Sequence, residues 1–270
     1  MKKTLLLILS IFFAIGLAAC NNDEKENTTE DKTKETASLY DQIKEKGEIS
    51  IGTEGTYAPF TFHDEAGKLT GFDVEIAEEV FKRLDIKVNF VEGKWDGLIA
   101  GLDAKRYDVV ANEVSINPER QEKYDFSDPY IVSKAVLLVA EGNDTIKSFE
   151  DLKGKKAAQS LNSNYNKMAE KFGATTTPIE GFNQAIDLVT SGRVDAHIND
   201  SLSYLDLKKQ RPDLAVKIAA EEENATENAF LFRKDSDELI KAVNGALADM
   251  KKDGTYLTIS EKWFGTDVSK

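Results

Sequence analysis

Residues 73–111 read DVEIAEEVFKRLDIKVNFVEGKWDGLIAGLDAKRYDVVA, and this stretch decides the fold class. Apolar residues recur at helical spacing over 73–84, a short strand pattern follows at 88–91, and a second helical pattern covers 95–104. The run at 108–111 is typical of a buried strand. Because strands alternate with helices, the stretch predicts an α/β fold with mostly parallel sheets.

The same alternation continues on both sides of this stretch. Strands are predicted at 48–52, 134–140, 194–198 and 229–232, a hairpin at 60–67, and helices at 39–46, 164–172, 182–191 and 236–252. Two such sets predict two lobes. No Pro/Gly-rich linker separates the sets, so we expect any hinge inside strands, near 133–135 and 227–229.

The N-terminus has the three-part pattern of a secretory signal. Lys2 and Lys3 precede an apolar run from Leu5 to Ala19 that is shorter than the ~20 residues needed to span a bilayer. We therefore expect residues 1–19 to be a signal peptide.

The only cysteine of the chain, Cys20, follows this run directly. Residues 17–20, Leu-Ala-Ala-Cys, resemble the lipobox of bacterial lipoproteins, which implies cleavage before Cys20 and acylation of its thiol. The alternative is an ordinary signal peptide that contains a cysteine. Residues 21–37 carry almost no apolar side chain, so we expect 20–38 to be a lipid-anchored flexible tether.

Composition excludes several classes of function. The net charge of −13 argues against a phosphate-backbone partner, so no nucleic acid is expected, and solubility explains the acid excess. A lone cysteine excludes a disulfide framework, and the two histidines, His63 and His197, are far apart, so we expect no metal site. The sequence has neither a Walker A motif nor a GxGxxG loop, and we expect no cofactor.

Four segments together resemble the polar amino-acid family of periplasmic-type solute-binding proteins, and within it the cystine binders. The segments are Gly52–Phe60 (GTEGTYAPF), Gly71–Ile76 (GFDVEI), Trp95–Ile99 (WDGLI) with Asp108–Ile116 (DVVANEVSI) and Glu119-Arg120, and Asp125–Tyr130 (DFSDPY). The order and spacing of these segments extend over nearly all of residues 39–270.

The resemblance implies a type II periplasmic-binding-protein fold, two α/β lobes hinged by two strands. Lobe 1 would comprise residues 39–134 and 228–270, and lobe 2 residues 135–227. It also implies a non-enzymatic lipoprotein at the extracytoplasmic face of the cell membrane, which delivers an amino acid to the permease and ATPase subunits of an ABC importer.

A free amino acid presents a carboxylate and an ammonium, each of which needs a partner when buried. Arg120 offers a bidentate fork for the carboxylate, and the resemblance places it at the family's carboxylate-binding arginine. Ser163 and Asn164 open a predicted helix whose N–H groups would hold the same carboxylate. Asp200 matches the family's ammonium-binding aspartate, and Ser115 adds a hydroxyl. A surface arginine and a helix N-cap are the alternative interpretations of Arg120 and Asp200.

The remaining site residues concern the ligand's side chain. The resemblance places Tyr57 and Trp95 as an aromatic pair around it, with core packing as the alternative, and Asn112 and Glu113 follow the Asn-Glu/Gln-Val pattern of cystine binders. We hypothesise that Glu54 or Glu113 meets the distal ammonium of cystine.

Other ligands and functions stay open at this point. Glutamine, arginine and histidine are alternative ligands. An enzyme resembling cyclohexadienyl dehydratases, with Glu113 as its acid, and an amino-acid receptor domain are alternative functions, and Ser201, His197 and Asp200 lack the nucleophile elbow of a hydrolase.

Overall fold

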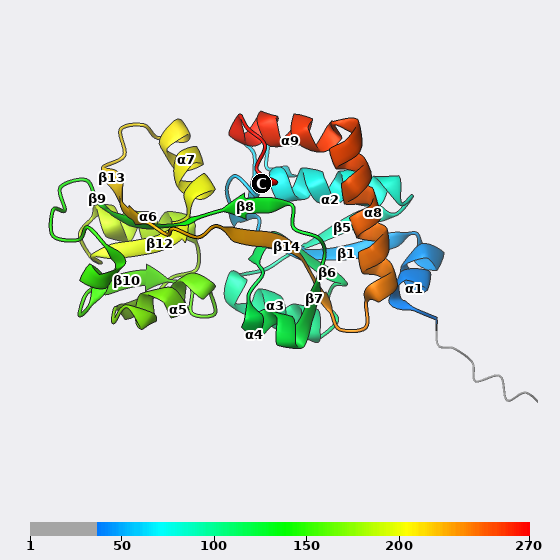
Figure 1. Cartoon of the computed structure of the whole chain (residues 1–270), viewed down its shortest axis with the longest axis horizontal. Helices are drawn as coiled ribbons and strands as arrows, with labels where there is room; N and C mark the ends of the chain where they lie inside the picture. The colour runs from blue at the N-terminus through cyan, green and yellow to red at the C-terminus, as the bar shows by residue number, and fades with distance from the viewer. Residues whose placement is uncertain (1–36) are drawn as a thin grey trace, which may run out of the picture. The chain divides into compact units, whose positions relative to one another are not determined.

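The structure is a computed structural model, and it describes residues 37–270, which form one compact unit. The predicted signal peptide, Cys20 and nearly all of the predicted tether lie outside the described residues. The described part has the two-lobed α/β fold, with one main sheet in each lobe (Figure 1).

The first lobe is built on a sheet of strand order β5-β1-β6-β14-β7, with β8 paired to β14. Its strands are β1 (Glu48–Thr53), β5 (Lys87–Glu92), β6 (Val109–Ser115), β7 (Tyr124–Phe126), β8 (Ile131–Ser133) and β14 (Thr226–Arg233). A small sheet holds β2 (Thr56–Tyr57), β3 (Thr61–His63) and β4 (Leu69–Thr70). The helices of this lobe are α1 (Leu39–Lys46), α2 (Phe72–Arg83), α3 (Trp95–Asp103), α4 (Pro118–Lys123), α8 (Asp237–Asp253) and α9 (Thr255–Phe264).

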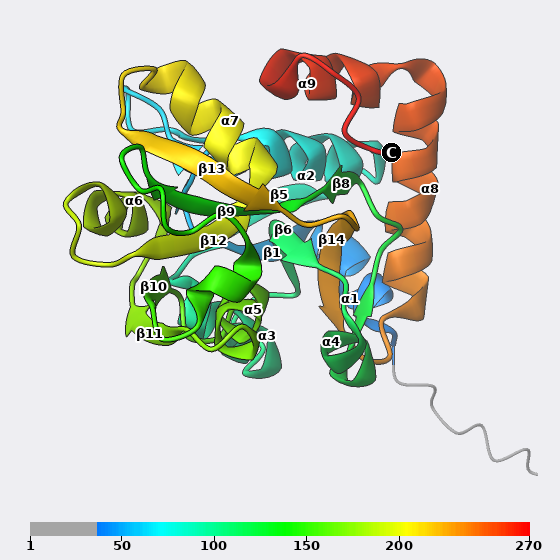
Figure 2. The ribbon, with the colours of Figure 1, turned by 60° about the vertical axis from the view of Figure 1, so that its left-hand side comes forward.

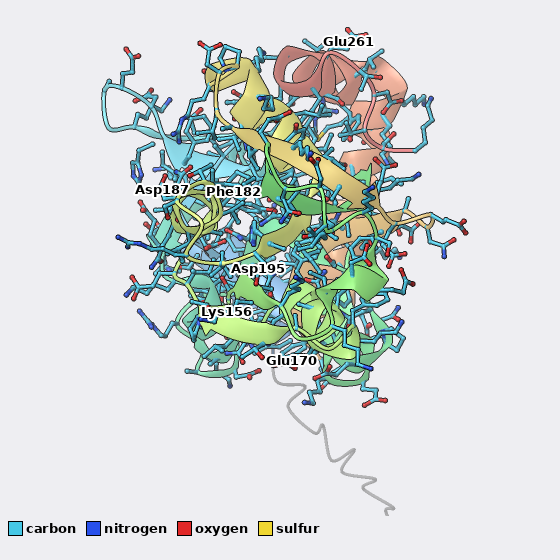
Figure 3. The ribbon with its side chains drawn as sticks, turned by 90° about the vertical axis from the view of Figure 1, so that its left-hand side faces the viewer. Lys156, Glu170, Phe182, Asp187, Asp195 and Glu261 are labelled. Atoms are coloured by element: carbon cyan, nitrogen blue, oxygen red, sulfur yellow. The ribbon has the colours of Figure 1, made fainter. Side chains whose placement is uncertain are left out.

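The second lobe is built on a sheet of order β11-β10-β12-β9-β13. Its elements are β9 (Ala135–Ala140), the 3-10 helix η1 (Phe149–Leu152), β10 (Lys156–Gln159), α5 (Asn164–Lys171), β11 (Thr175–Pro178), α6 (Phe182–Thr190), β12 (Ala196–Asp200), α7 (Ser201–Gln210) and β13 (Val216–Glu221). Figure 3 looks onto this lobe, and the charged side chains of Lys156, Glu170 and Asp187 lie on its solvent-facing side.

Both main sheets are mixed, so the prediction of mostly parallel sheets holds only for part of each. In the first sheet β5, β1 and β6 are parallel, and β14 is antiparallel to β6, β7 and β8. In the second sheet β11, β10 and β12 are parallel, and β9 is antiparallel to β12 and β13. The antiparallel pairs all involve β14 or β9. These are the strands by which the chain enters each sheet from the other lobe.

The chain changes sheet at two points. Lys134 alone separates β8 from β9, and residues 222–225 separate β13 from β14 (Figure 2). The sequence-based boundary between residues 227 and 228 falls inside β14, which pairs with β8 as far as Thr226. Both connections are therefore short and lie beside each other.

Amphipathic helices cover the sheets. On α2 the side chains of Phe72, Ile76, Ala77 and Val80 are fully buried, whereas its Glu78 is exposed. Burying such a stripe supplies most of the stability of a surface helix. None of the helices in residues 37–270 is both long and apolar enough to cross a membrane.

Gly71, the N-cap of α2, has a backbone conformation that only glycine adopts without strain. Its φ is 133°, and a Cβ at this position would lie 2.1 Å from the carbonyl oxygen of Phe60. The close approach is required because Phe72 N–H donates to Pro59 O and Asp73 N–H donates to Phe60 O. These two bonds fix where α2 begins, and with it the position of Asp73.

We predict that Gly71→Ala lowers the free energy of unfolding by about 3 kcal/mol or more, because the new Cβ collides with backbone and φ is unfavourable. Gly245→Ala is the matched control. Gly245 is exposed inside α8 with open space around it, so alanine there should raise stability by about 0.5–1 kcal/mol. Urea unfolding measures both variants, and equal effects would contradict the explanation.

Candidate ligand-binding site

A cavity of about 60 Å³ lies between the two lobes. All the predicted site residues except Arg120 and Asp200 line it: Glu54, Tyr57, Trp95, Asn112, Glu113, Ser115, Ser163 and Asn164. Arg120 lines a neighbouring cavity that shares Trp95 and Asn164 with the first. Asp200 lines neither cavity because it is almost fully buried, and its Oδ2 lies 3.5 Å from the Tyr165 hydroxyl.

Asn112 holds Glu54 at one wall of the cavity. Its Oδ1 accepts from the backbone N–H of Glu54 at 2.7 Å, and its Nδ2 donates to Glu54 Oε2 at 2.7 Å. These bonds tie the end of β1 to the parallel strand β6. Burial raises the pKa of Glu54 to about 7, against the opposing hydrogen bond from Asn112.

A β-bulge turns Glu113 into the cavity. The register between β6 and β14 shifts beside it, and its φ is 49°, which is rare for a residue with a side chain. The N–H of Glu113 donates to the buried carboxyl of Asp73 on α2. Burial raises the pKa of Asp73 to about 7. Asp73 thus positions Glu113, a role that the sequence analysis missed.

The hydrogen bonds around Tyr57 assign a proton to Glu113. The ring nitrogen Nδ1 of His197 lies 2.7 Å from Ala158 O, so it carries the proton, and Nε2 accepts from Asn199 Nδ2 at 3.0 Å. Asn199 Oδ1 then faces Tyr57 and accepts its hydroxyl proton at 2.7 Å. The Tyr57 oxygen lies 3.0 Å from Glu113 Oε2 and has no second proton to give. Glu113 must therefore be the donor of that bond.

The pKa shifts agree with this assignment. Burial, then the neighbouring carboxyl of Asp200, raises the pKa of Glu113 well above its usual range. Burial lowers the pKa of His197 to about 4, so its ring is neutral. Both shifts favour the neutral forms of the Glu113 carboxyl and the His197 ring.

Asp200 is held by both lobes. Its Oδ1 accepts from Leu202 N–H at 2.8 Å and so caps α7, as the alternative interpretation expected. Its Oδ2 accepts from Ser133, at the end of β8, and lies 3.5 Å from the Tyr165 hydroxyl. Burial raises its pKa, and the hydrogen bond from Ser133 opposes the rise. Capping α7 engages Oδ1, whereas Oδ2 is bonded to the other lobe through Ser133, so Asp200 does more than cap a helix.

Arg120 is buried and forms no ion pair with residues 37–270. Its Nη1 donates to Ser115 O at 2.8 Å, and the guanidinium lies 5.3 Å from the centre of the Trp95 ring. Burial lowers its pKa to about 10, so the group stays charged at neutral pH. A buried cation with open donors can bind an anion.

The predicted helix start is confirmed, since α5 begins at Asn164 with Ser163 as its N-cap. Ser163 Oγ accepts from Asn166 N–H at 3.0 Å, and Asn164 Nδ2 donates across the cleft to Ser115 Oγ at 3.3 Å. The N-terminus of α5 therefore faces strand β6 of the other lobe.

Aromatic side chains form another part of the cavity wall. Tyr57 packs at 5.2 Å from Phe60 and at 6.3 Å, edge to face, from Phe182 of the other lobe. Phe60 is fully buried, and Trp95 is half-buried where the two cavities meet.

The sequence analysis missed the contribution of the second sheet to the cavity. The lining residues that were not proposed as ligand contacts are Gln159, Ser160, Tyr165, Ile179, Gly181, Phe182, His197 and Asn199. Gln159 and Asn199 lie at the carboxyl ends of the parallel strands β10 and β12. The rule that ligands bind at carboxyl ends of parallel strands could have identified both.

The lobes also contact each other outside the cavity, through Asp96 on α3. Its Oδ1 accepts from Asn162 N–H at 2.9 Å, its Oδ2 from Leu161 N–H at 3.3 Å, and its carbonyl from Asn162 Nδ2 at 3.0 Å. Lys94 and Glu180 form an exposed ion pair across the same cleft at 2.5 Å. Within residues 37–270 no group of His, Cys, Asp and Glu side chains is suited to hold a metal ion.

A family model, bacterial extracellular solute-binding proteins, family 3, matches residues 49–266. The chain belongs to this family. The L-cystine-binding protein TcyA of Bacillus subtilis (strain 168) is 48% identical over 100% of both chains. The L-cystine-binding protein TcyJ of Escherichia coli (strain K12) is 43% identical over 86% of this chain and 88% of TcyJ.

Solved structures of family members share the fold. An ancestral arginine-binding protein bound to arginine is 42% identical, with a TM-score of 0.76 over 81% of this chain and 98% of that one. An ancestral amino acid-binding protein, a precursor of cyclohexadienyl dehydratase, is 39% identical, with a TM-score of 0.77 over 84% and 100%.

The arrangement of the lobes resembles the ligand-bound relative more than an open one. The L-cystine solute receptor of Neisseria gonorrhoeae in its unliganded open conformation is 44% identical over 87% and 100% of the chains, but its TM-score is only 0.58. With the contacts across the cleft, this difference indicates a closed arrangement of residues 37–270.

We predict that Asp96→Ala weakens the binding of every amino-acid ligand by the same factor, about tenfold. The reason is that Asp96 stabilises only the closed form, through its bonds to Leu161 and Asn162. Lys94→Ala is the control. Its ion pair is exposed, so its effect should be less than about fivefold. Calorimetric titration measures both, and a change in the order of ligand preference in Asp96→Ala would contradict the assignment.

Proposed function

We propose that the protein is the substrate-binding component of an ABC importer, that it captures L-cystine, and that it is not an enzyme. The observation that carries the binding role is the buried, unpaired guanidinium of Arg120 together with the buried carboxyl pair of Glu113 and Asp200. The full-length identity of 48% to TcyA supports cystine as the ligand.

In this proposal the first amino-acid group of the ligand binds between the lobes. Arg120 pairs with its carboxylate, helped by Ser115 and by the N-terminus of α5 at Ser163 and Asn164. Its ammonium pairs with Asp200, while Glu113 keeps the proton that it donates to Tyr57. These contacts come from both lobes, residues 39–134 with 228–270 and residues 135–227, so the ligand favours the closed form that a permease would recognise.

The rest of the ligand lies against Tyr57 and Trp95, with Glu54, oriented by Asn112, facing the distal ammonium. Glu113 contacts Tyr57 and the first ammonium group. Glu54 is therefore the carboxyl group that remains for the second ammonium group. A dissociation constant near 1 μM corresponds to about −8 kcal/mol, within reach of one paired zwitterion and aromatic packing.

Arginine is the second candidate ligand, because the carboxylate of Glu54 would also pair with a guanidinium and an arginine-bound relative shares the fold. A dehydratase activity is the alternative from another class, since Glu113 holds a proton in the cleft. The relatives named as binding proteins favour binding.

We predict micromolar binding of cystine, and a loss of about 100-fold or more in Arg120→Ala and in Asp200→Asn, because each variant leaves a ligand charge buried without its partner. Arg106→Ala, at an exposed arginine, is the control and should bind as the parent does. Calorimetry with cystine, glutamine, arginine and histidine tests the assignment.

Heat with another amino acid and none with cystine would end the cystine assignment. Product formed from prephenate or arogenate would show that the protein is an enzyme.

We also propose that Cys20 is acylated after cleavage of residues 1–19, which would tether the domain to the outer face of the cell membrane beside the permease and ATPase subunits. The support is the sequence around Cys20 alone.

We predict that Cys20→Ser abolishes incorporation of labelled palmitate and releases the protein from the membrane fraction, whereas Asn21→Ser changes neither. Retention of Cys20→Ser in washed membranes would contradict acylation as the anchor. Fractionation followed by immunoblotting measures the distribution.

A further inference from the structure

Gln159 presents a buried hydrogen-bond donor with no partner. The side chain stands at the end of β10, is 1% exposed and lines the cavity between the lobes. Its Nε2 has no hydrogen-bond partner in residues 37–270. A buried polar atom without a partner is costly, and the cost is removed when a ligand supplies an acceptor.

Several residues of the second lobe that line the cavity with Gln159 have no free side-chain acceptor. Both nitrogens of His197 are occupied, by Ala158 O and by Asn199 Nδ2. Phe182 and Ile179 are apolar. Asn199 Oδ1 already accepts from Tyr57 and from the N–H of Asp200. The Nε2 donor of Gln159 is therefore available to an acceptor on a ligand in the cavity.

Glu54 is the complementary group on the opposite wall. It reaches the same cavity from the first lobe, and only its Oε2 is engaged by a side chain, that of Asn112. A free donor from one lobe and a carboxylate from the other match a ligand group that contains both an acceptor and a cation. An α-amino acid end has this composition.

We propose that Gln159 determines specificity by donating to a second carboxylate of the ligand, while Glu54 accepts from the second ammonium. This inference rests on the proposed function, in which Arg120, Asp200 and Glu113 bind the first amino-acid end. The substrate class is then the diamino dicarboxylic acids, which carry a zwitterion at each end.

Comparing two ligands tests the contribution of the second carboxylate alone. L-cystine has it, and the mixed disulfide of L-cysteine with cysteamine lacks it but keeps both ammonium groups and the disulfide. Gln159→Leu, close in volume and without the amide, should bind cystine about tenfold or more weakly and the mixed disulfide unchanged. Gln159→Glu should disfavour cystine further, because it places a carboxylate against a carboxylate.

Gln42→Leu, the same substitution at an exposed position of α1, is the control and should bind both ligands as the parent does. Thermal unfolding of each variant shows that the fold is retained. Equal weakening of both ligands in Gln159→Leu, or cystine binding that is unchanged, would overturn the role of Gln159 and leave the proposed function standing. An absence of cystine binding by the unaltered protein would overturn both.

Discussion

Two carboxyl groups from opposite lobes, those of Glu113 and Asp200, lie near each other out of water. Such a pair is tolerated when one member keeps a proton, and the bonds from His197 through Asn199 to Tyr57 show which one does. The rest of the cavity depends on this cluster, because it brings β6 and β12 together. It also sets the charge that the cleft can offer to a ligand.

The position of Glu113 depends in turn on contacts far from the cavity. Its unusual backbone conformation is stabilised by Asp73, and Asp73 is placed by the backbone contacts of Gly71 and Phe72 with the loop before β3. The motif Gly-Phe-Asp therefore contributes to the site without lining it. Buried residues of this kind act on a ligand through another side chain.

Much of the fold could be predicted from the sequence, since long periodic segments such as α2 and α8 were located within two residues of their ends. Several elements were not predicted, and for two of them, α9 and β13, the reason can be identified. Gly254 ends α8 and also begins α9, and a glycine after a helical pattern is typical of a helix end. The strand β13 has a weak pattern because two alanines, Ala219 and Ala220, stand beside its bulge.

For the site, the types and order of residues were enough to choose a set of side chains, most of which line one cavity. The roles of these side chains remain a proposal. The bulge at Glu113 could not be predicted, because its partner Asp73 is 40 residues away and nothing local encodes the pairing. Gln159 and Asn199 likewise require the strand order of the second sheet, which is a property of tertiary structure.

The connection through Lys134 has a mechanical consequence. A single residue joins two strands that are each paired within their own sheet, and the other crossing at residues 222–225 runs beside it, with Glu222 N–H bonded to Ala135 O. Two neighbouring pivots define one axis, so the lobes can rotate about it but cannot slide or twist freely. Each closure then brings the same residues of the two lobes together. The geometry of the closed cleft is therefore determined by the two connections and not by the ligand.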